Sequence, residues 1–492
     1  MMPRGLPRGL ATCILAALSA STLLSLGGCS EDGGPAGPVD DRPNPYDEFD
    51  GPDPREVHGL ETFELNDLPY PPHNSPSEPG FAKRLELGRL LYFDQILSGK
   101  LDTSCGSCHH PAMAWQDGVD LSAGVSGTGF GPERVLTDEN VMLMPRNTPT
   151  AMNLGFSSAE PGGPPSHRGL MLWDGRTAGL ERQSLQPTAT IDEMSYHLPN
   201  HGVHTYSDSA AADTMVTRLQ QIDEYVDLFA QAFPLEASEM SEDPGQHVIR
   251  KNTLERALAA YQRELVTIDS PYDQWVRGDD RALTLEQLRG ADLFYGKANC
   301  AACHSGPMFS DFSFSRIGVA DNPRAPGRYP VERGGNGVDI GRMEHTSNPE
   351  DVHRYRVPPL RNVALTGPWF RHGTANSLRD VVIFHLIAGV PPDPDTEPER
   401  AAVYEEYMGR LQLTRTPGPI LTPEVLDDRL VPIDLTDQEI DDLIAFMDAL
   451  TDRTIDGRSD PTVPERVPSG SAVVEARAPF SMVPLPEHVD AR

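Results

Sequence analysis

Two short motifs in the sequence combine a pair of thiols with an imidazole. In each, two cysteines are separated by two residues and followed at once by a histidine: Cys105, Cys108 and His109, then Cys300, Cys303 and His304. This spacing attaches a c-type haem, because the thiols form thioethers with one haem edge and the histidine binds the iron. With six cysteines and fifteen histidines in 492 residues, two chance copies are negligible. The motifs therefore predict two covalently bound haem c groups.

Other sites also use paired cysteines. Four cysteines can hold a structural zinc ion, and one pair can act as a thioredoxin-type redox couple. The repeated histidine and the predicted export of the chain favour haem, because haem c is attached outside the cytoplasm. The zinc and redox sites remain as alternatives.

The first thirty residues are typical of an export signal. Arg4 and Arg8 precede a mostly apolar stretch over 10–26. The Leu-Gly-Gly-Cys sequence that ends at Cys29 resembles the bacterial lipobox, whose cysteine is acylated; an ordinary signal with an incidental cysteine is the alternative. No later segment has about 18 consecutive apolar residues. We therefore expect an exported protein on the periplasmic side, held through lipid on Cys29 to a bacterial membrane, with the outer membrane favoured.

The overall charge excludes one class of partner. Lys+Arg 41 against Asp+Glu 73 gives a net charge of −32, so we expect no nucleic-acid binding and easier approach by cationic or neutral partners. The 47 prolines and 43 glycines favour short helices joined by long irregular connections. The length is sufficient for two or more domains.

Helical periodicity marks elements that could position the two motifs. A helix that begins after Gly80 and runs into the first motif is predicted from Leu87, Leu90 and Leu91. Further helices are expected over 214–233 and 252–265. The apolar face of the latter consists of Leu254, Leu258, Tyr261 and Leu265. Residues 116–145 are rich in Gly, Ser and Asp, which predicts a long loop.

Two capping boxes mark helices in the second half. Thr284 with Gln287 opens a helix that leads to the second motif, and Thr436 with Glu439 opens another. The predicted inward face of the last helix consists of Ile440, Leu443, Ile444, Met447 and Leu450. Because a helix precedes each motif and closes each half, we expect a mainly α fold of two cytochrome c-like domains with long irregular loops. Each domain would carry one covalently bound c-type haem.

These signals divide the chain into five parts. The expected order is a lipoprotein signal peptide over 1–28, an acidic Gly- and Pro-rich tether over 29–60, an N-terminal haem domain over 61–275, a C-terminal haem domain over 276–455 and a Pro-rich tail over 456–492. The tether composition cannot bury enough apolar surface to fold. The tail is expected to be an irregular surface segment.

Longer motifs lie in order between Ala82 and Leu450. The first half contains "LGRLLYFDQILSG", "SCGSCHHP", "PRNTPTAMN" and "LWDGRTAGLERQ", and the second contains "GADLFYGKANCAACHSGPMFSD", "DIGR" and "VPPLRNVALTGPWFRHG". Together they resemble the bacterial dihaem cytochrome c peroxidase family, including its MauG-type branch. The resemblance implies that hydrogen peroxide reacts at the N-terminal haem and that electrons pass through the C-terminal haem. It also implies a small electron-donor protein or a protein substrate as partner, with a homodimer as one candidate assembly.

The resemblance assigns roles to three residues of the first half. Trp173 corresponds to the tryptophan that mediates electron exchange between the haems, and Gln183 and Glu193 match the polar pair over the peroxide-binding haem. A carboxylate beside an open iron site can take a proton from one peroxide oxygen and deliver it to the other. The alternative is that Trp173 belongs to the core and the other two are solvated helix-face residues.

The resemblance also implies a calcium site between the two halves. Asn147 in "RNTP", with Thr366 and Pro368 in "LTGP", matches the family's ligands, which are an amide oxygen and backbone carbonyls. Calcium is therefore a candidate cofactor beside the two haems.

The first haem site departs from the classical peroxidases. At the position where they carry an iron-capping histidine, this chain has Val125, which cannot ligate iron. Met142 or Met144 lies in a nearby segment that looks like an insertion, although a methionine there is more often loop packing. We therefore expect the first haem to be five-coordinate or water-bound without reductive activation, as in the MauG-type branch.

The second departure concerns the sixth ligand of the second haem. Classical peroxidases have methionine and MauG has tyrosine where this chain has His385, with Met308 and Met343 as competing ligands. Imidazole stabilises ferric iron relative to methionine, which favours MauG-like oxidation of a partner or substrate. A classical peroxidase that detoxifies peroxide with a small donor protein is the first alternative. A non-enzymatic dihaem electron carrier is the second.

Overall fold

The computed structural model describes residues 42–195, 208–240, 247–319, 321–322, 324–325, 339–387, 393–398, 401–402, 405, 426–454 and 460–473. The predicted signal peptide, Cys29 and residues 474–492 of the predicted tail lie outside these ranges. The elements discussed below belong to one unit that begins at Asn44.

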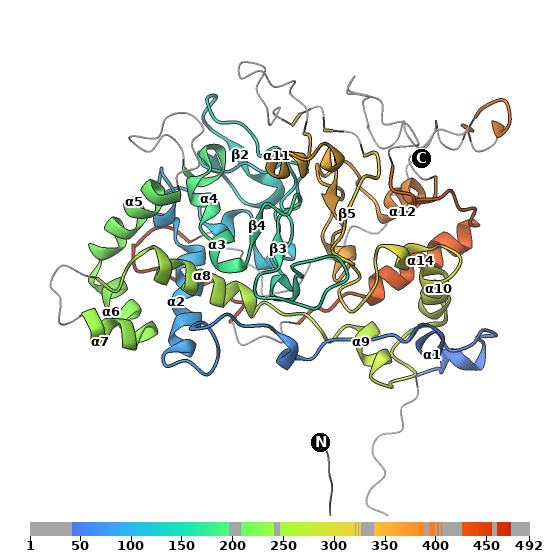
Figure 1. Cartoon of the computed structure of the whole chain (residues 1–492), viewed down its shortest axis with the longest axis horizontal. Helices are drawn as coiled ribbons and strands as arrows, with labels where there is room; N and C mark the ends of the chain where they lie inside the picture. The colour runs from blue at the N-terminus through green and yellow to red at the C-terminus, as the bar shows by residue number, and fades with distance from the viewer. Residues whose placement is uncertain are drawn as a thin grey trace, which may run out of the picture. The chain divides into compact units, whose positions relative to one another are not determined.

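Most α-helices of the described residues lie in two groups (Figure 1). The first group contains α2 (Phe81–Phe93), α3 (Leu180–Gln183), α4 (Gln186–Ala189), α5 (Asp208–Gln220), α6 (Asp223–Ala232), α7 (Pro234–Met240) and α8 (Lys251–Arg263). The second contains α1 (Pro54–His58), α9 (Pro271–Val276), α10 (Leu285–Tyr295), α12 (Leu378–Leu386) and α14 (Asp437–Ala449). A short helix, α11 (Met343–Thr346), lies among the connections. The fold is mainly α, as the sequence predicted.

Strands are short and occur only as antiparallel pairs within the described residues. β1 (Gly127–Thr128) pairs with β2 (Val135–Leu136), β3 (Leu170–Met171) with β4 (Thr177–Ala178), and β5 (Phe314–Ser315) with β6 (Tyr355–Arg356). The first pair lies in the predicted 116–145 loop, which is otherwise largely irregular. These pairs brace long connections, and the helices carry the core.

Each helix group is built on one crossing pair. α2 packs against α8, and α10 packs against α14. At both crossings a glycine lets two backbones meet, because a Cβ at Gly88 would overlap the carbonyl of Ala257 and a Cβ at Gly290 would overlap that of Asp442. In both pairs the helix that carries the glycine leads into a haem-attachment motif. The two halves thus repeat one local architecture.

Each crossing pair has its own hydrophobic core. The predicted face of α8 is confirmed, since its four residues are fully buried in the first core: Leu254, Leu258, Tyr261 and Leu265. On α14, Ile440, Leu443, Met447 and Leu450 are buried in the second core, whereas Ile444 is half-buried at its edge. Burying a large apolar side chain stabilises a fold by about 1.5–3 kcal/mol. The two cores therefore hold the two motifs independently.

Both predicted capping boxes are present. Thr284 accepts a hydrogen bond from the Gln287 amide while the Gln287 side chain accepts one from the Thr284 amide. Thr436 and Glu439 make the same exchange at the start of α14. The predicted single helix over 214–233 is wrong, because α5 ends at Gln220 and α6 starts at Asp223. The acidic first turn of α6 suits a helix N-terminus, which the apolar periodicity did not reveal.

The two terminal segments pack onto the opposite halves. Residues 44–60, which we expected to belong to an unfolded tether, contain α1, and Tyr46 packs against the second core. The composition of this segment is polar. In the fold, however, Arg55 donates to the Trp275 carbonyl and lies over the Trp275 ring, and the Trp275 indole donates to Tyr46. An isolated segment would lack these contacts. At the other end, Val467 is buried in the first core, a contact that the sequence did not predict.

Along the described residues, no helix combines the length and the apolar character needed to cross a membrane.

Candidate active site

One cavity of about 430 Å³ brings together residues from both halves of the chain. It is lined by all six residues of the two haem-attachment motifs, namely Cys105, Cys108, His109, Cys300, Cys303 and His304. The other predicted site residues line it too: Trp173, Gln183, Glu193, His385, Asn147, Thr366 and Pro368. The sequence motifs that carried the functional prediction therefore converge on a single cavity.

His109 is held in an orientation that suits iron binding. It follows the 3₁₀ turn Cys105–Ser107, and its Nδ1 lies 3.1 Å from the Trp115 carbonyl oxygen. A histidine whose Nδ1 donates to a carbonyl keeps its lone pair on Nε2, the usual arrangement for a metal ligand. Burial lowers the pKa of His109, which keeps the imidazole neutral.

His304 repeats this arrangement in the second half. It follows the 3₁₀ turn Cys300–Ala302, and its Nδ1 lies 2.9 Å from the Phe309 carbonyl oxygen. Its pKa falls to about 4, mainly through burial and partly through the charge of nearby His385. The two imidazoles are therefore close enough to interact, and both are neutral near pH 7.

His385 has the same hydrogen-bond pattern from a different element. Its Nδ1 lies 2.8 Å from the Val381 carbonyl one turn earlier in α12, and burial lowers its pKa. Of the competing ligands, Met308 lines the cavity whereas Met343 is absent from the lining. Met308 also packs in a small apolar cluster with Phe312. His385 therefore lines the same cavity as His304, and its Nδ1 contact leaves Nε2 free to bind a metal.

The four cysteines fit haem attachment better than zinc. None of them forms a disulfide. In the part of the chain that the structure describes, the group of three potential ligands within 4.8 Å is Asp174, Glu344 and His345, which contains no cysteine. A Cys₄ zinc site needs all four thiols around one point, so the arrangement disfavours that alternative. Burial raises the pKa of Cys105, Cys108 and Cys300 to about 12 and that of Cys303 to about 11.

Two polar side chains complete the His109 side of the cavity. Gln183 ends α3, and Glu193 lies in a π-helical turn over Ile191–Ser195. The charge of Glu193 raises the pKa of both Cys105 and Cys108, which places its carboxylate near the first motif. The buried Oε1 of Gln183 has no hydrogen-bond partner among the described residues. An unpartnered acceptor and a carboxylate thus face a space where a small polar molecule could bind.

The loop that contains Val125 is hydrogen-bonded to the turn that carries Glu193. Val125 occupies the position where classical peroxidases carry the iron-capping histidine. It is fully buried, and its amide donates to the Glu193 carbonyl at 2.8 Å. Arg134 donates to the carbonyls of Ala123 and Gly124 at 2.8 and 2.9 Å. The segment that looked like an insertion therefore braces the loop at 123–125, which is in turn hydrogen-bonded to the turn that carries Glu193. In the same segment, Met144 lines the cavity and Met142 is exposed.

Trp173 lies on the lining between the β3 and β4 strands. Its indole N–H donates to the Asn147 carbonyl at 3.0 Å, and its own carbonyl accepts from the Arg356 amide at 2.7 Å. The indole is thus held by Asn147, and the Trp173 backbone is held by Arg356 of the second half. This fixed position suits a bridge between two redox centres.

A buried ion-pair network beside Trp173 was not predicted from the sequence. Arg146 binds Asp174 at 2.6 Å and Asp339 through two bonds of 2.7 Å, so it joins the two halves. The Arg146 charge holds the pKa of Asp339 well below its ordinary value despite burial. The available signal was a charged residue in each of two motifs, Arg146 in "PRNTP" and Asp174 in "WDGR". The third member, Asp339, is far away in the sequence.

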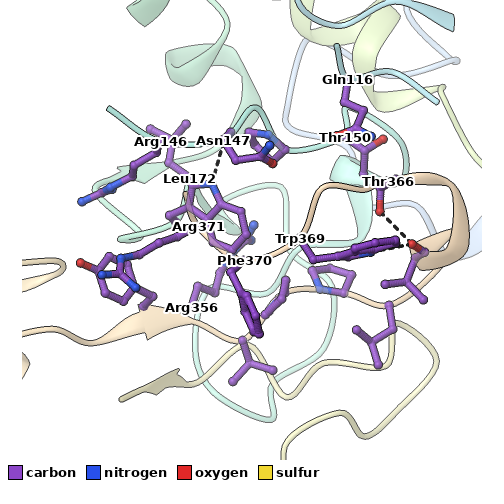
Figure 2. Close-up of a pocket in the computed structure, with 18 of the residues that line it drawn as sticks. Gln116, Arg146, Asn147, Thr150, Leu172, Arg356, Thr366, Trp369, Phe370 and Arg371 are labelled. Carbon is purple, nitrogen blue, oxygen red and sulfur yellow. Dashed lines mark hydrogen bonds between the residues drawn. The ribbon is translucent and has the colours of Figure 1, made fainter. Parts of the chain in front are cut away.

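The three predicted calcium ligands all line the cavity. Figure 2 shows Asn147 between Arg146 and Arg371 on one side and Gln116, Thr150 and Thr366 on the other. The Asn147 side-chain amide donates to the Val119 carbonyl at 2.8 Å, which leaves its oxygen available. Gln116 donates to the Gly367 carbonyl, next to Pro368, at 2.7 Å. The atoms that these residues could offer to an ion, an amide oxygen and carbonyl oxygens, are the type of ligand that calcium prefers.

Comparisons with known proteins agree with this geometry. Residues 82–281 match the family model described as di-haem cytochrome c peroxidase. The chain is 30% identical over 402 residues to a cytochrome-c peroxidase of Denitromonas iodatirespirans, covering 78% of this chain and 85% of that protein. It is 29% identical over 383 residues to the methylamine utilization protein MauG of Methylorubrum extorquens, covering 78% and 81%.

A solved structure extends the similarity to the fold. The crystal structure of a MauG-like protein associated with microbial copper homeostasis superposes with a TM-score of 0.58 at 28% identity, and the match covers 81% of this chain and 96% of that one. The chain belongs to the di-haem cytochrome c peroxidase family. It is a di-haem peroxidase, and haem is the family's cofactor. The relatives include both MauG and cytochrome-c peroxidases, so their names do not decide between these two activities.

Proposed function

We propose that this protein reduces hydrogen peroxide at a haem on His109 and oxidises a partner or substrate through a haem on His304, as MauG-like enzymes do. Each haem would be attached covalently, through Cys105 and Cys108 or through Cys300 and Cys303. The observation that carries the MauG-like part is His385, because its neutral imidazole faces His304 across the same cavity.

The His109 side holds the proton-handling groups. The bound haem supplies an iron with an open coordination position and the electrons that break the peroxide O–O bond. Glu193 takes a proton from the nearer peroxide oxygen and returns it to the departing one, so that this oxygen leaves as water. Gln183 orients the peroxide through its unpartnered amide oxygen. The buried Val125 loop holds Glu193 in place.

The His304 side holds no comparable acid or base from the predicted set. His385 would bind the iron of this haem and so exclude peroxide from it, and an imidazole ligand would lower the reduction potential relative to methionine. In its resting ferric state, such a centre would be a poor acceptor for electrons from a mild donor protein. It is better suited to store one oxidising equivalent and exchange it through Trp173.

Three further features of the proposal come from the sequence. The chain is exported to the periplasmic side and held to a membrane through lipid on Cys29. Calcium binds at Asn147, Thr366 and Pro368 and ties the halves together beside Trp173. Two domains divide near residue 275, a division that the separate cores of α2–α8 and α10–α14 support.

The rival function is a classical peroxidase, and His385→Met separates the two. We expect that excess peroxide gives the wild-type protein a long-lived oxidised spectrum and that His385→Met shortens its lifetime and raises the potential of the second haem. The test is stopped-flow absorption after mixing with peroxide, together with a redox titration. An unchanged lifetime and potential in the variant would show that His385 is not the ligand. A spectrum insensitive to peroxide would favour a non-enzymatic electron carrier.

A further inference from the structure

A chain of aromatic side chains leads from the His304 site towards the surface of the second half. The Phe309 carbonyl binds His304, and the Phe309 ring lies 4.8 Å from Tyr272 between centroids. The Tyr272 ring lies 6.0 Å from that of Trp275. The Trp275 indole N–H then donates to the Tyr46 hydroxyl at 3.0 Å. Neighbouring members of the chain are thus in ring contact or hydrogen-bonded.

The exposure of these residues gives the chain a direction. Tyr272 is 1% exposed and Trp275 is fully buried, whereas Tyr46 is half-buried at the surface. Tyr46 comes from the terminal segment that the sequence had placed in an unfolded tether. The chain therefore reaches the outside of the protein at Tyr46, and a side branch reaches the half-buried Tyr295, whose hydroxyl lies 3.4 Å from that of Tyr272.

A proton acceptor stands beside Tyr46. Burial raises the pKa of the Tyr46 phenol to about 12, and the nearby Asp53 carboxylate adds to this shift. An oxidised phenol is a strong acid and must release its proton, and Asp53 can receive it. Asp53 is otherwise held by Arg55 at 2.6 Å, so its position is fixed.

Arg55 also biases where the oxidising equivalent rests. Its guanidinium lies 5.4 Å from the Tyr46 ring centroid and 5.3 Å from that of Trp275. A cation over a ring opposes a second positive charge on that ring. Oxidised Trp275 is a cation, whereas oxidised Tyr46 becomes neutral after its proton moves to Asp53. The equivalent is therefore more stable on Tyr46.

The His109 site has an aromatic cluster of its own. Tyr92, Trp115 and Tyr261 are in mutual contact, with centroids 5.8 Å apart for Tyr92 and Trp115 and 6.1 Å for Trp115 and Tyr261. All three are at most 1% exposed. The buried Trp115 Nε1 has no hydrogen-bond partner within the described residues. Ring contacts continue from Tyr92 through Phe93 and His110 to the half-buried Phe130. Phe130 has no phenolic proton to release, so this branch does not end in a tyrosine as the second one does.

We propose that Tyr46 is a surface oxidation site, at which an external donor is oxidised by equivalents that reach it from the His304 haem through Tyr272 and Trp275. This inference rests on the proposed peroxide reaction. Trp275 gives one electron towards the oxidised haem, and Tyr46 gives one electron to Trp275 and its phenolic proton to Asp53. The donor then gives one electron to Tyr46, and Asp53 returns the proton. Two such cycles, with two protons from solvent, reduce one hydrogen peroxide to two waters and oxidise two donors by one electron each.

The surroundings of Tyr46 select the charge of that donor. The same segment carries a run of acidic residues, namely Asp47, Glu48, Asp50, Asp53 and Glu56, and Asp280 pairs with Arg55 nearby. A negative surface attracts a positively charged partner and speeds its association. The donor that fits is a one-electron reductant with a basic face around its redox centre.

The test traps the radical and measures donor oxidation in the haem-loaded full-length protein. After peroxide is added with a nitroso spin trap, peptide mass spectrometry should find the adduct on Tyr46. Tyr46→Phe should abolish that adduct and slow the peroxide-driven oxidation of a reduced basic cytochrome c by roughly tenfold, because the phenol can no longer transfer its proton. Tyr70→Phe is the matched control. The Tyr70 hydroxyl donates to the Glu264 carboxylate, but its ring packs against Phe81, which is not a member of the aromatic chain. This control variant should change neither measurement.

The outcomes separate this proposal from the peroxide reaction. If wild-type protein shows the spectral response to peroxide but no adduct on Tyr46, or if Tyr46→Phe oxidises the cytochrome at the wild-type rate, the surface site is wrong and the peroxide reaction stands. If peroxide leaves the wild-type haem spectrum unchanged, both are wrong. An adduct confined to Trp275 would overturn the assignment to Tyr46.

Discussion

The His109 and His304 sites use the same scaffold for different chemistry. Each proximal histidine follows a short 3₁₀ turn at the end of a glycine-crossed helix pair, and each donates Nδ1 to a carbonyl five or six residues later. They differ in the side chains that complete them. The first site has Gln183 and Glu193, whereas the second has His385.

This difference shows which parts of the fold determine reactivity. The repeated helix pairs place two histidines in equivalent positions, and the elements that complete each site differ in secondary structure. Glu193 sits in a π-helical turn braced by a loop, and His385 sits in the regular helix α12. One scaffold can therefore carry one site open to peroxide and one closed to it.

Removing the carboxylate of the open site should have the largest effect. Glu193→Gln keeps the shape of the side chain but cannot exchange protons, so the rate of the peroxide-induced spectral change should fall by about 10²–10⁴-fold. Stopped-flow absorption measures this rate. Glu139→Gln, at an exposed position of the neighbouring loop, is the control and should react like wild type. A Glu193→Gln protein that reacts at the wild-type rate would contradict the role of Glu193.

Two of the acid–arginine pairs, one beside each core, differ in burial and should differ in strength. Asp273 binds Arg361 at 2.8 Å with side chains 0% and 2% exposed, whereas Glu181 binds Arg263 at 2.9 Å and is 23% exposed. Breaking a fully buried pair costs about 3–5 kcal/mol. Asp273→Asn should therefore lower the free energy of unfolding by that amount, and Glu181→Gln by less, in denaturant titrations near pH 7. Equal losses would show that burial does not set the difference.

The same pairs predict how stability depends on pH. The arginines lower the pKa of Asp273 and of Glu181 against the opposing effect of burial. A depressed carboxyl pKa adds stability that is complete above its unfolded value, 3.8 for Asp273, and is lost as the pH falls through the folded value. Asp273→Asn should therefore flatten the acid side of the stability curve.

A smaller effect tests whether the two helix crossings are equivalent. Gly88→Ala and Gly290→Ala each force a Cβ against a carbonyl of the partner helix, and such overpacking costs about 1–3 kcal/mol. The crossings lie in separate cores, so the double variant should lose the sum of the two single losses. Thermal unfolding of the three variants measures this. A neutral effect at one glycine would mean that only one crossing is tight.

The sequence predicted local features and motifs better than contacts between distant segments. Capping boxes such as Thr284 with Gln287 depend on residues three apart and were found where expected. The pairing of Tyr46 with Trp275 and the burial of Val467 depend on how the chain returns on itself, and no local pattern encodes that return. The break at Gln221 was missed because apolar spacing continued across it.

The candidate site shows the same division. Residues in fixed-spacing motifs, such as His109 and His304, could be assigned directly, and Trp173, Gln183 and Glu193 could be assigned by resemblance. The Arg146–Asp339 pair could not, because its two members lie 193 positions apart. Arg134, which braces the loop next to Glu193, lies in a segment that looked like an insertion.

The central claim is that the two sites differ in access to their iron, and the electron paramagnetic resonance spectrum of the ferric protein tests it most directly. We predict one high-spin haem, assigned to His109, and one low-spin haem, assigned to His304 with His385. Peroxide should remove the high-spin signal first. Two low-spin haems that peroxide leaves unchanged would contradict the account.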